Sequence, residues 1–325
     1  MQLFQQVQTI PVGAFIGAAV VLIPLPSHWR ARNVATLSII AWLFVIDMIY
    51  GINALVWRNN IEVRLVVWCD ITTKIIIGSS SALPAATLCI CKYLESVAAT
   101  RIVRMSKQDK RRQMRFELAL CFGVPFFFMA LHYVVQGHRF DIIESFGCQP
   151  ATYISIPGVF VVWFPPLILA TGTLIYASLA LYHFFMQRLT FTLHLQNINS
   201  ALTTGRYLRL IAMSVTEILW GTTLTALVMA ENIVGGLRPW TNWNDVHSNF
   251  SRIGRFALLQ YPPYYLQLMI LFAWAIPASS IIFFLFFGFS EDVMGDYKRG
   301  LVWFRRKVLR QTVNEKTSLS DLPTR

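Results

Sequence analysis

The chain has 325 residues, of which 55% are hydrophobic and only 14% are charged, and its mean hydropathy is +0.53. A soluble domain carries about a quarter charged residues, so this composition excludes an ordinary soluble protein. The net charge of +12 fits a membrane surface better than nucleic acid, because the positive residues are spread over loops between apolar stretches.

Seven apolar stretches are each long enough to cross about 30 Å of hydrocarbon as a helix. A transmembrane β-barrel would instead show alternating segments of about ten residues, so we expect an all-α integral membrane protein, a seven-transmembrane helix bundle. The first stretch follows no basic segment and precedes no small-residue cleavage site, which favours a retained helix over a signal peptide. The predicted spans are Val7–Leu25, Val34–Trp57, Trp68–Cys91, Phe116–Val135, Pro157–Phe185, Tyr207–Ala230 and Tyr264–Phe289.

The Lys and Arg residues predict the orientation of this bundle. Most of the 28 lie in the connections 92–115 and 186–206 or after residue 290. Basic loops stay in the cytoplasm, so we expect the N-terminus outside and the C-terminus inside. The chain then divides into a seven-helix domain, residues 1–290, and a short basic cytoplasmic tail, residues 291–325, which we expect to be partly disordered.

Two carboxylates lie deep within apolar stretches and have no partner nearby in the sequence. They are Asp47 in the second predicted span and Glu217 in the sixth. Carboxylates inside a membrane are costly and face the bundle interior, so they are candidates for a polar switch, a proton site or an ion site. The alternative is a carboxylate that only forms a hydrogen bond with a neighbouring helix.

The third predicted span begins with a charged pair. Asp70 and Lys74 are one helical turn apart and can face each other at positions i and i+4. One interpretation is a salt bridge between them at the membrane interface. The other is that both line the rim of a ligand cavity, where a ligand recruits one of them.

Two cysteines are predicted on the outer side, which is an oxidising compartment. Cys69 lies at the outer mouth of the third span, and Cys148 lies in the loop between the fourth and fifth spans. A disulfide between them would tie that loop over the bundle and close a loop of about 80 residues, a constraint of roughly 4 kcal/mol in the chain-entropy model. The alternative is two free thiols.

The inner connections are rich in positive charge. Positive-inside topology explains much of it, but the density in 92–115 also suits a protein partner with an acidic face. The candidate coupling residues are Arg101, Arg104, Lys107, Lys110, Arg111, Arg112, Arg115, Arg188, Arg206 and Arg209.

The outer loop 231–263 is rich in tryptophan and contains Trp240 and Trp243. It also contains the sequence Asn249-Phe250-Ser251, a glycosylation acceptor on the favourable side of the membrane. Nothing in the chain predicts an enzyme, a cofactor or a metal site, because the histidines and cysteines show no metal-ligand spacing and no GxSxG sequence is present.

Several motifs resemble the fungal lipopeptide mating-pheromone receptors, the a-factor type of class D G-protein-coupled receptors, and most of all those of basidiomycetes. They are spread from the first span to the start of the tail. The motifs are LIPLPSHWRARN (22–33), WCDITTK (68–74), ALPAATLCI (82–90), ALHYVVQGHRFDIIESFGCQP (130–150), ALTTGRYLRL (201–210), LRPWTNWNDVHSNFSRIGRF (237–256) and IPASSIIFFLFFGFSED (276–292).

The resemblance implies a multi-pass plasma-membrane receptor for a farnesylated, carboxymethylated peptide pheromone. Such a receptor activates the alpha subunit of a heterotrimeric G protein upstream of a mating MAP-kinase pathway, uses no cofactor and binds no nucleic acid. We expect the peptide to contact Trp68, Asp70, Lys74, Trp240 and Trp243. The oligomeric state, a homodimer included, stays open. The alternative function is an ion- or proton-coupled transporter with Asp47, Asp70 and Glu217 as its relay.

Overall fold

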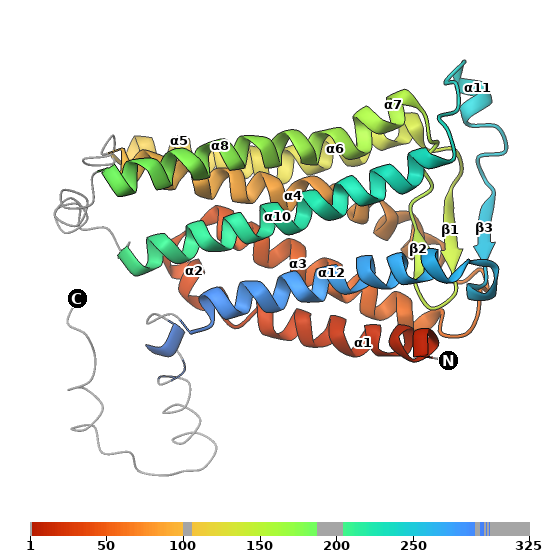
Figure 1. Ribbon diagram of the computed structural model, residues 1–325, viewed down its shortest axis with the longest axis horizontal. Coiled ribbons are helices and arrows are strands. Elements are labelled where there is room, and N and C mark those ends of the chain that lie inside the picture. Colours follow the sequence, from red (N-terminus) through yellow and green to blue (C-terminus); the bar gives the residue numbers. More distant parts are fainter. Residues whose placement is uncertain are drawn as a thin grey trace, which may run out of the picture.

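The computed structural model describes residues 2–99, 106–186, 204–289, 293–295, 297 and 299. Within them, seven helical segments are long and apolar enough to cross a membrane, which confirms the predicted seven-helix class. The seven run side by side, with the N-terminus at the end that also holds a small sheet (Figure 1). We call this the sheet end of the bundle and the other the basic end.

The long helices are α1 (Gln2–Val21), α3 (Val34–Val56), α4 (Val66–Ala98), α5 with α6 (Lys107–Leu118 and Val124–Leu131), α8 (Phe164–Met186), α10 (Thr204–Val234) and α12 (Pro263–Phe287). Short helices are α2 (Leu25–Ala31), α7 (Ile156–Gly158) and α11 (Trp243–Val246), with 3-10 turns at His132–Val135 and Leu258–Gln260. The strands are β1 (Phe140–Ile143), β2 (Gly147–Gln149) and β3 (Ile253–Phe256).

Prolines shape the fourth and fifth spans. A π-helical turn, Ala119–Gly123, precedes Pro125, and another, Val159–Trp163, precedes Pro165. Proline has no N–H to give to the carbonyl four residues before it, so the helix must adjust and that carbonyl needs another donor. For Pro125 that carbonyl belongs to Cys121, and the indole N–H of Trp42 donates to it at 3.1 Å. The adjustment thereby bonds the second span to the fourth.

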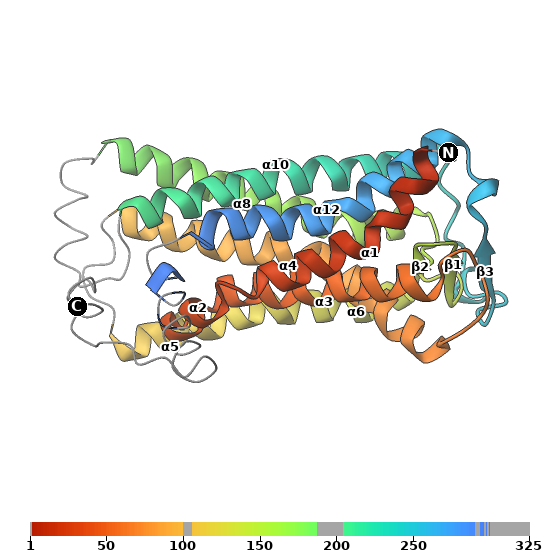
Figure 2. The same cartoon turned by 90° about the horizontal axis from the view of Figure 1, so that it is seen from below.

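Helix α4 lies at the centre of the bundle, in contact with α3, α6, α8 and α10 (Figure 2). Helix α1 packs against α3 and α12 on the other side. The main apolar core joins α3, α4, α10 and α12, and it includes Leu43, Leu94, Met213 and Phe283. The α4 side chains that contact other elements are therefore fixed by packing on several sides.

The third and fourth spans are longer than predicted. Helix α4 continues through Ala98, and α5 begins at Lys107, so most of the basic connection 92–115 is helical rather than a loop. Ser106 caps α5 by accepting from the Asp109 N–H at 3.1 Å, while the Asp109 side chain accepts from the Ser106 N–H at 3.2 Å. This reciprocal capping box starts a polar helix beyond the apolar stretch.

The three strands form one sheet in the order β2-β1-β3. Strands β1 and β2 make an antiparallel hairpin between the fourth and fifth spans, whereas β3 comes from the connection between α10 and α12 and pairs with β1 in parallel. Gly147 begins β2 with a φ of +72°, and an added Cβ there would lie 2.5 Å from the Cβ of Asn53. Because β1 and β3 come from different connections, the sheet joins two loops far apart in sequence, and we call this sheet the lid.

Candidate functional site

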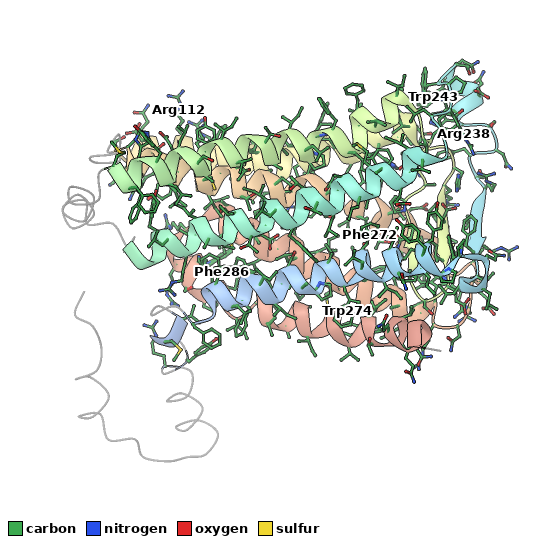
Figure 3. All side chains as sticks on the ribbon, viewed as in Figure 1. Arg112, Arg238, Trp243, Phe272, Trp274 and Phe286 are labelled. Carbon is green, nitrogen blue, oxygen red and sulfur yellow. A yellow bond between two sulfur atoms is a disulfide. The ribbon has the colours of Figure 1, made fainter. Side chains whose placement is uncertain are left out.

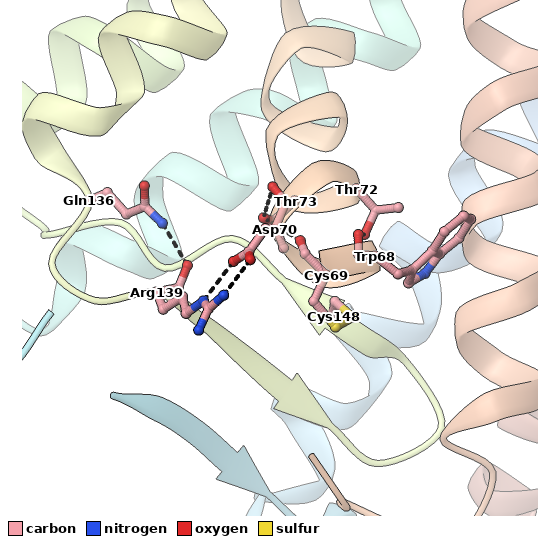
Figure 4. Close-up of polar contacts among 8 residues, drawn as sticks. All are labelled: Trp68, Cys69, Asp70, Thr72, Thr73, Gln136, Arg139 and Cys148. Carbon is pink, nitrogen blue, oxygen red and sulfur yellow. Dashed lines mark hydrogen bonds and ion pairs between the residues drawn. A yellow bond between two sulfur atoms is a disulfide. The ribbon is translucent and has the colours of Figure 1, made fainter. Parts of the chain in front are cut away.

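A disulfide between Cys69 and Cys148 holds the lid on α4 (Figure 4). Their Cα atoms are 5.3 Å apart across 79 residues of sequence. Both cysteines are fully buried in an apolar cluster with Trp57, Phe140 and Ile142. The bridge predicted from the sequence is thus part of a packed interface between the lid and the helix ends.

Asp70 and Lys74 do not pair with each other, which corrects the interpretation of a salt bridge between them. Asp70 accepts two hydrogen bonds from the Arg139 guanidinium, at 2.8 Å from Nε and 2.6 Å from the terminal nitrogen (Figure 4). A bidentate pair of this kind matches the planar fork of arginine and is better oriented than a lysine contact. Hydrogen bonding to Asp70 also raises the pKa of Arg139. Asp70 therefore holds the start of the lid against α4.

Lys74 points to a different group of side chains. Its ammonium donates to Gln136 Oε1 at 2.6 Å and contacts His132 Nδ1 at 3.1 Å. The other ring nitrogen of His132 is 3.0 Å from the Thr152 hydroxyl, and the Gln136 amide donates to the Arg139 carbonyl at 2.6 Å. Lys74 thus links the third span to the end of the fourth through hydrogen bonds with His132 and Gln136.

The three tryptophans proposed to meet a ligand have different surroundings. The Trp68 indole donates to Asn53 Oδ1 at 2.9 Å and packs against the disulfide cluster, so it supports the lid. Trp243 is exposed at the sheet end (Figure 3), where its ring stacks on His247 with centroids 3.9 Å apart. Trp240 is half-buried, and its indole N–H has no partner among the described residues.

Residues 243–250 fold back onto the end of the fourth span. Tyr133 contacts the rings of Trp243, His247 and Phe250, with centroids 5.4 to 5.7 Å apart. We call these four residues the aromatic cluster. Asn249, the candidate glycosylation site, is exposed in the same loop and has a φ of +55°. Its side chain is accessible for modification, and its occupancy stays a prediction.

The buried carboxylates meet adjacent serines on α12. Ser280 donates to Asp47 Oδ2 at 2.6 Å, and Ser279 lies 3.5 Å from Glu217 Oε2. Asp47 is fully buried, and its Oδ1 has no partner among the described residues, whereas Glu217 is half-buried. Gly17 of α1 also packs against Asp47, where an added Cβ would lie 2.7 Å from Oδ2. One turn of α12 therefore contacts carboxylates from α3 and α10.

Replacing Ser280 with alanine should lower the free energy of unfolding by roughly 2 kcal/mol, because both oxygens of a buried carboxylate would then lack a donor. Thermal unfolding of the purified protein in lipid nanodiscs measures this change. Ser279→Ala is the matched control, and its longer bond to a less buried carboxylate should produce less than half the effect. Equal effects from the two variants would contradict a special role for the Asp47 contact.

The candidate coupling residues lie at the basic end. Lys107, Lys110, Arg111, Arg112 and Arg115 are all exposed on α5, and Figure 3 shows Arg112 at this end of the bundle. Arg209 is on α10 and is half-buried, with its Nε donating to the Gly205 carbonyl at 3.4 Å. Arg101, Arg104, Arg188 and the predicted tail beyond residue 299 lie outside the described residues, as does the side chain of Arg206.

Sequence reasoning missed Arg139, His132 and Gln136, which complete the polar contacts of Asp70 and Lys74. No local pattern marks them, because they lie 58 to 69 residues from their partners. Ser279 and Ser280 were also missed as partners of the buried carboxylates. The adjacent serines inside an apolar stretch were the available signal.

These observations define a multi-pass membrane protein with a disulfide-held lid at one end, buried polar contacts between its helices and a basic helical extension at the other end. The described residues contain no group of three or more His, Cys, Asp or Glu side chains that could hold a metal. The chain belongs to the pheromone A receptor family, whose family model matches residues 9–306. The predicted family resemblance is therefore confirmed.

Similar proteins come from several fungi. The pheromone B beta 1 receptor of Schizophyllum commune is 54% identical over 289 residues, covering 89% of this chain and 53% of that protein. Pheromone receptor 1 of Ustilago hordei is 29% identical over 295 residues, covering 90% and 82%. The pheromone M-factor receptor of Schizosaccharomyces pombe is 26% identical over 247 residues, covering 72% and 65%. The chain spans about half the length of the Schizophyllum relatives that it matches.

Proposed function

We propose that this chain is a G-protein-coupled receptor for a farnesylated peptide mating pheromone. It lies in the plasma membrane and activates the alpha subunit of a heterotrimeric G protein upstream of a mating MAP-kinase pathway. The observation that carries this proposal is the family match over residues 9–306, which covers the last six spans and most of the first. The names of the relatives, each a pheromone receptor, support the same function.

In the proposed orientation the sheet end faces outward and the basic end faces the cytoplasm. Two observations support it. The disulfide belongs to the sheet end, and disulfides persist in an oxidising compartment. The exposed cations of α5 lie at the opposite end, as the positive-inside rule requires of a cytoplasmic segment.

The sheet end offers both parts of a lipopeptide a surface of suitable chemistry. A mainly apolar crevice of about 130 Å³ lies between α1 and α3, lined by Val7, Gln8, Pro11, Val12, Ala54, Leu55, Arg58 and Ser145. Each methylene of a lipid chain that is buried contributes about 0.8 kcal/mol, so even part of a prenyl group in this crevice adds affinity. The aromatic cluster, in which Tyr133 and Trp243 are exposed, is available to the peptide part.

The ligand acts by binding one arrangement of the helices better than another. In our proposal the basic ends of α8 and α10 then move apart and expose a surface for the G protein, to which the cations of α5 contribute. The receptor catalyses no covalent reaction in this scheme. Nucleotide exchange takes place in its partner.

The transporter alternative has less support from the geometry. A proton or ion relay through Asp47, Asp70 and Glu217 needs all three carboxylates to be free to change partners. Asp70 accepts two hydrogen bonds from Arg139, so it holds the lid and is not free to change partners. Uptake that depends on pH in vesicles containing the purified protein would favour the transporter.

A response to synthetic lipopeptides in a yeast strain that lacks its own pheromone receptors tests the proposal. The panel consists of farnesylated peptide methyl esters, and each has an unfarnesylated counterpart. We expect at least one farnesylated peptide to activate the G-protein pathway and its counterpart to be much weaker. A receptor that reaches the cell surface and responds to no member of a broad panel would contradict the proposal.

The Asp70–Arg139 pair gives a separate prediction about the lid. Asp70→Asn and Arg139→Gln should each weaken the pheromone response to a similar extent, and the double variant should be no worse than either. Both side chains are 36% exposed, so we expect a coupling of only about 1 kcal/mol in the free energy of unfolding. If Asp70→Asn abolishes ligand binding while Arg139→Gln does not, Asp70 contacts the ligand directly.

A further inference from the structure

Lys74 is a cation at the sheet end, and the carboxylate nearest to it in the sequence, Asp70, is paired with another residue. Asp70 lies one turn away on α4, but the Arg139 guanidinium takes both of its oxygens. Among the described residues, the hydrogen-bond partners of the Lys74 ammonium are the Gln136 amide and the His132 ring. No carboxylate of the described residues lies within ion-pair distance of it.

The hydrogen bonds around Lys74 also define the charge of its neighbours. The ammonium has only donors, so His132 Nδ1 must accept from it, which leaves the proton on Nε2 to donate to the Thr152 hydroxyl. His132 is therefore the neutral tautomer, and Gln136 carries no charge. With Asp70 and Arg139 neutralising each other, the group of Lys74, His132, Gln136, Asp70 and Arg139 has one positive charge in excess.

An excess charge at this place is costly. Lys74 is half-buried, and His132 and Gln136 are almost fully buried. A cation removed from water needs an opposite charge or a wet cavity. The amide and imidazole acceptors supply only part of that stabilisation. An anionic group beside Lys74 would supply the rest.

The position of Lys74 also brings it close to the surface proposed to meet the peptide. Its ammonium lies 5.8 Å from the centre of the Tyr133 ring, and Tyr133 belongs to the aromatic cluster with Trp243. Tyr133 is 46% exposed and Lys74 is half-buried, so both side chains keep some accessible surface. A peptide on the aromatic cluster is therefore within reach of the ammonium.

We propose that Lys74 binds the side-chain carboxylate of an aspartate or glutamate in the peptide part of the pheromone. This inference rests on the proposed function. A methyl-ester C-terminus carries no charge, so the anion must come from a side chain of the peptide. In this proposal Asp70, which lies on α4, holds the lid through Arg139 rather than contacting the ligand. The phosphate of an anionic lipid is the other source of a suitable anion, and the closeness of Lys74 to the aromatic cluster favours the peptide.

The experiment uses purified receptor in nanodiscs of phosphatidylcholine alone. The probes are pairs of synthetic farnesylated peptide methyl esters that differ only by glutamate or glutamine, with the acidic residue placed at each position in turn. Binding is measured by competition, and activation by G-protein nucleotide exchange. The receptor variants are Lys74→Gln and Lys74→Glu. Arg64→Gln is the matched control, because Arg64 is an exposed cation at the same end, paired with Glu62.

For at least one position, the wild-type receptor should bind the glutamate peptide about tenfold or more tightly than the glutamine peptide, the effect of a charge-assisted hydrogen bond. Lys74→Gln should reduce that ratio to about one, and Arg64→Gln should preserve it. Lys74→Glu should prefer a peptide with lysine at the same position. Since a swapped preference needs a folded receptor, misfolding cannot produce this result.

Four other results would each contradict a different part of the proposal. If peptides bind and activate but glutamate and glutamine are equivalent at every position, the carboxylate site is wrong and the proposed function stands. If the preference persists in Lys74→Gln, another cation binds the acid and the assignment to Lys74 is overturned. If adding anionic phosphatidylserine stabilises wild type but not Lys74→Gln, Lys74 binds lipid. If no peptide binds at all, both the site and the proposed function fail.

Discussion

Replacing Cys69 or Cys148 with serine is expected to reduce the amount of folded receptor at the cell surface severalfold and to abolish most of its pheromone response. The bridge spans 79 residues, and the chain-entropy model gives about 4 kcal/mol for a loop of this size. Each single variant also leaves a lone thiol inside the apolar cluster beneath the lid. Surface labelling of a tagged receptor and thermal unfolding of the purified protein measure the two effects.

The double variant is the control for this prediction. When two cysteines form one bridge, removing the second costs little more than removing the first, so Cys69→Ser with Cys148→Ser should match the single variants. Additive losses would indicate two independent packing roles. Normal expression and signalling in both single variants would show that the receptor works without the bridge.

Reversing the charges of Lys110, Arg111, Arg112 and Arg115 together is expected to lower G-protein activation about tenfold or more and to leave ligand affinity unchanged. The four side chains are exposed, so each contact with an acidic partner contributes only about 0.2–1 kcal/mol, and the effect comes from their sum. Nucleotide exchange at saturating ligand measures coupling. Competition binding measures affinity.

Ionic strength provides the control for that experiment. Salt screens exposed charges, so raising it should weaken coupling of the wild-type receptor and have a much smaller effect on the reversed variant. The substitutions are compatible with the helix, because glutamate is a good helix former and these positions are exposed. Full coupling by the reversed variant would mean that the α5 cations serve membrane topology alone.

The sequence predicted the helices well because hydrocarbon leaves the backbone few alternatives. Seven long apolar stretches had to be helices, and the structure places a helix at each of them. The inner end of the third span and the start of the fourth were predicted less well. Hydropathy alone predicts a loop where a helix is charged, as it is over residues 107–115. The pattern Ser106-Lys107-Gln108-Asp109 was the missed signal, because a serine followed three residues later by an acid is a helix-start motif.

The partners of the charged residues at the sheet end were beyond reach from the sequence. The i,i+4 rule favoured a bond between Asp70 and Lys74, and that rule compares only local alternatives. Arg139 competes from 69 residues away with two oriented hydrogen bonds, and the lid brings it there. Whether Lys74 or Arg139 pairs with Asp70 depends on where β1 lies in the fold. The spacing of the residues in the sequence does not predict that position.

The parallel pairing of β3 with β1 holds the start of α12 at the sheet end. Strand β3 ends only a few residues before α12, and the Leu258 N–H between them donates to Glu144 Oε2 at 2.9 Å. A tilt of α12 during the proposed activation would therefore rotate about the sheet end. The helix has 25 residues and is about 37 Å long, so a tilt of about 10° displaces its far end by about 6 Å. In the proposed activation, a small rotation of α12 near the ligand would therefore become a displacement of several ångströms at the basic end.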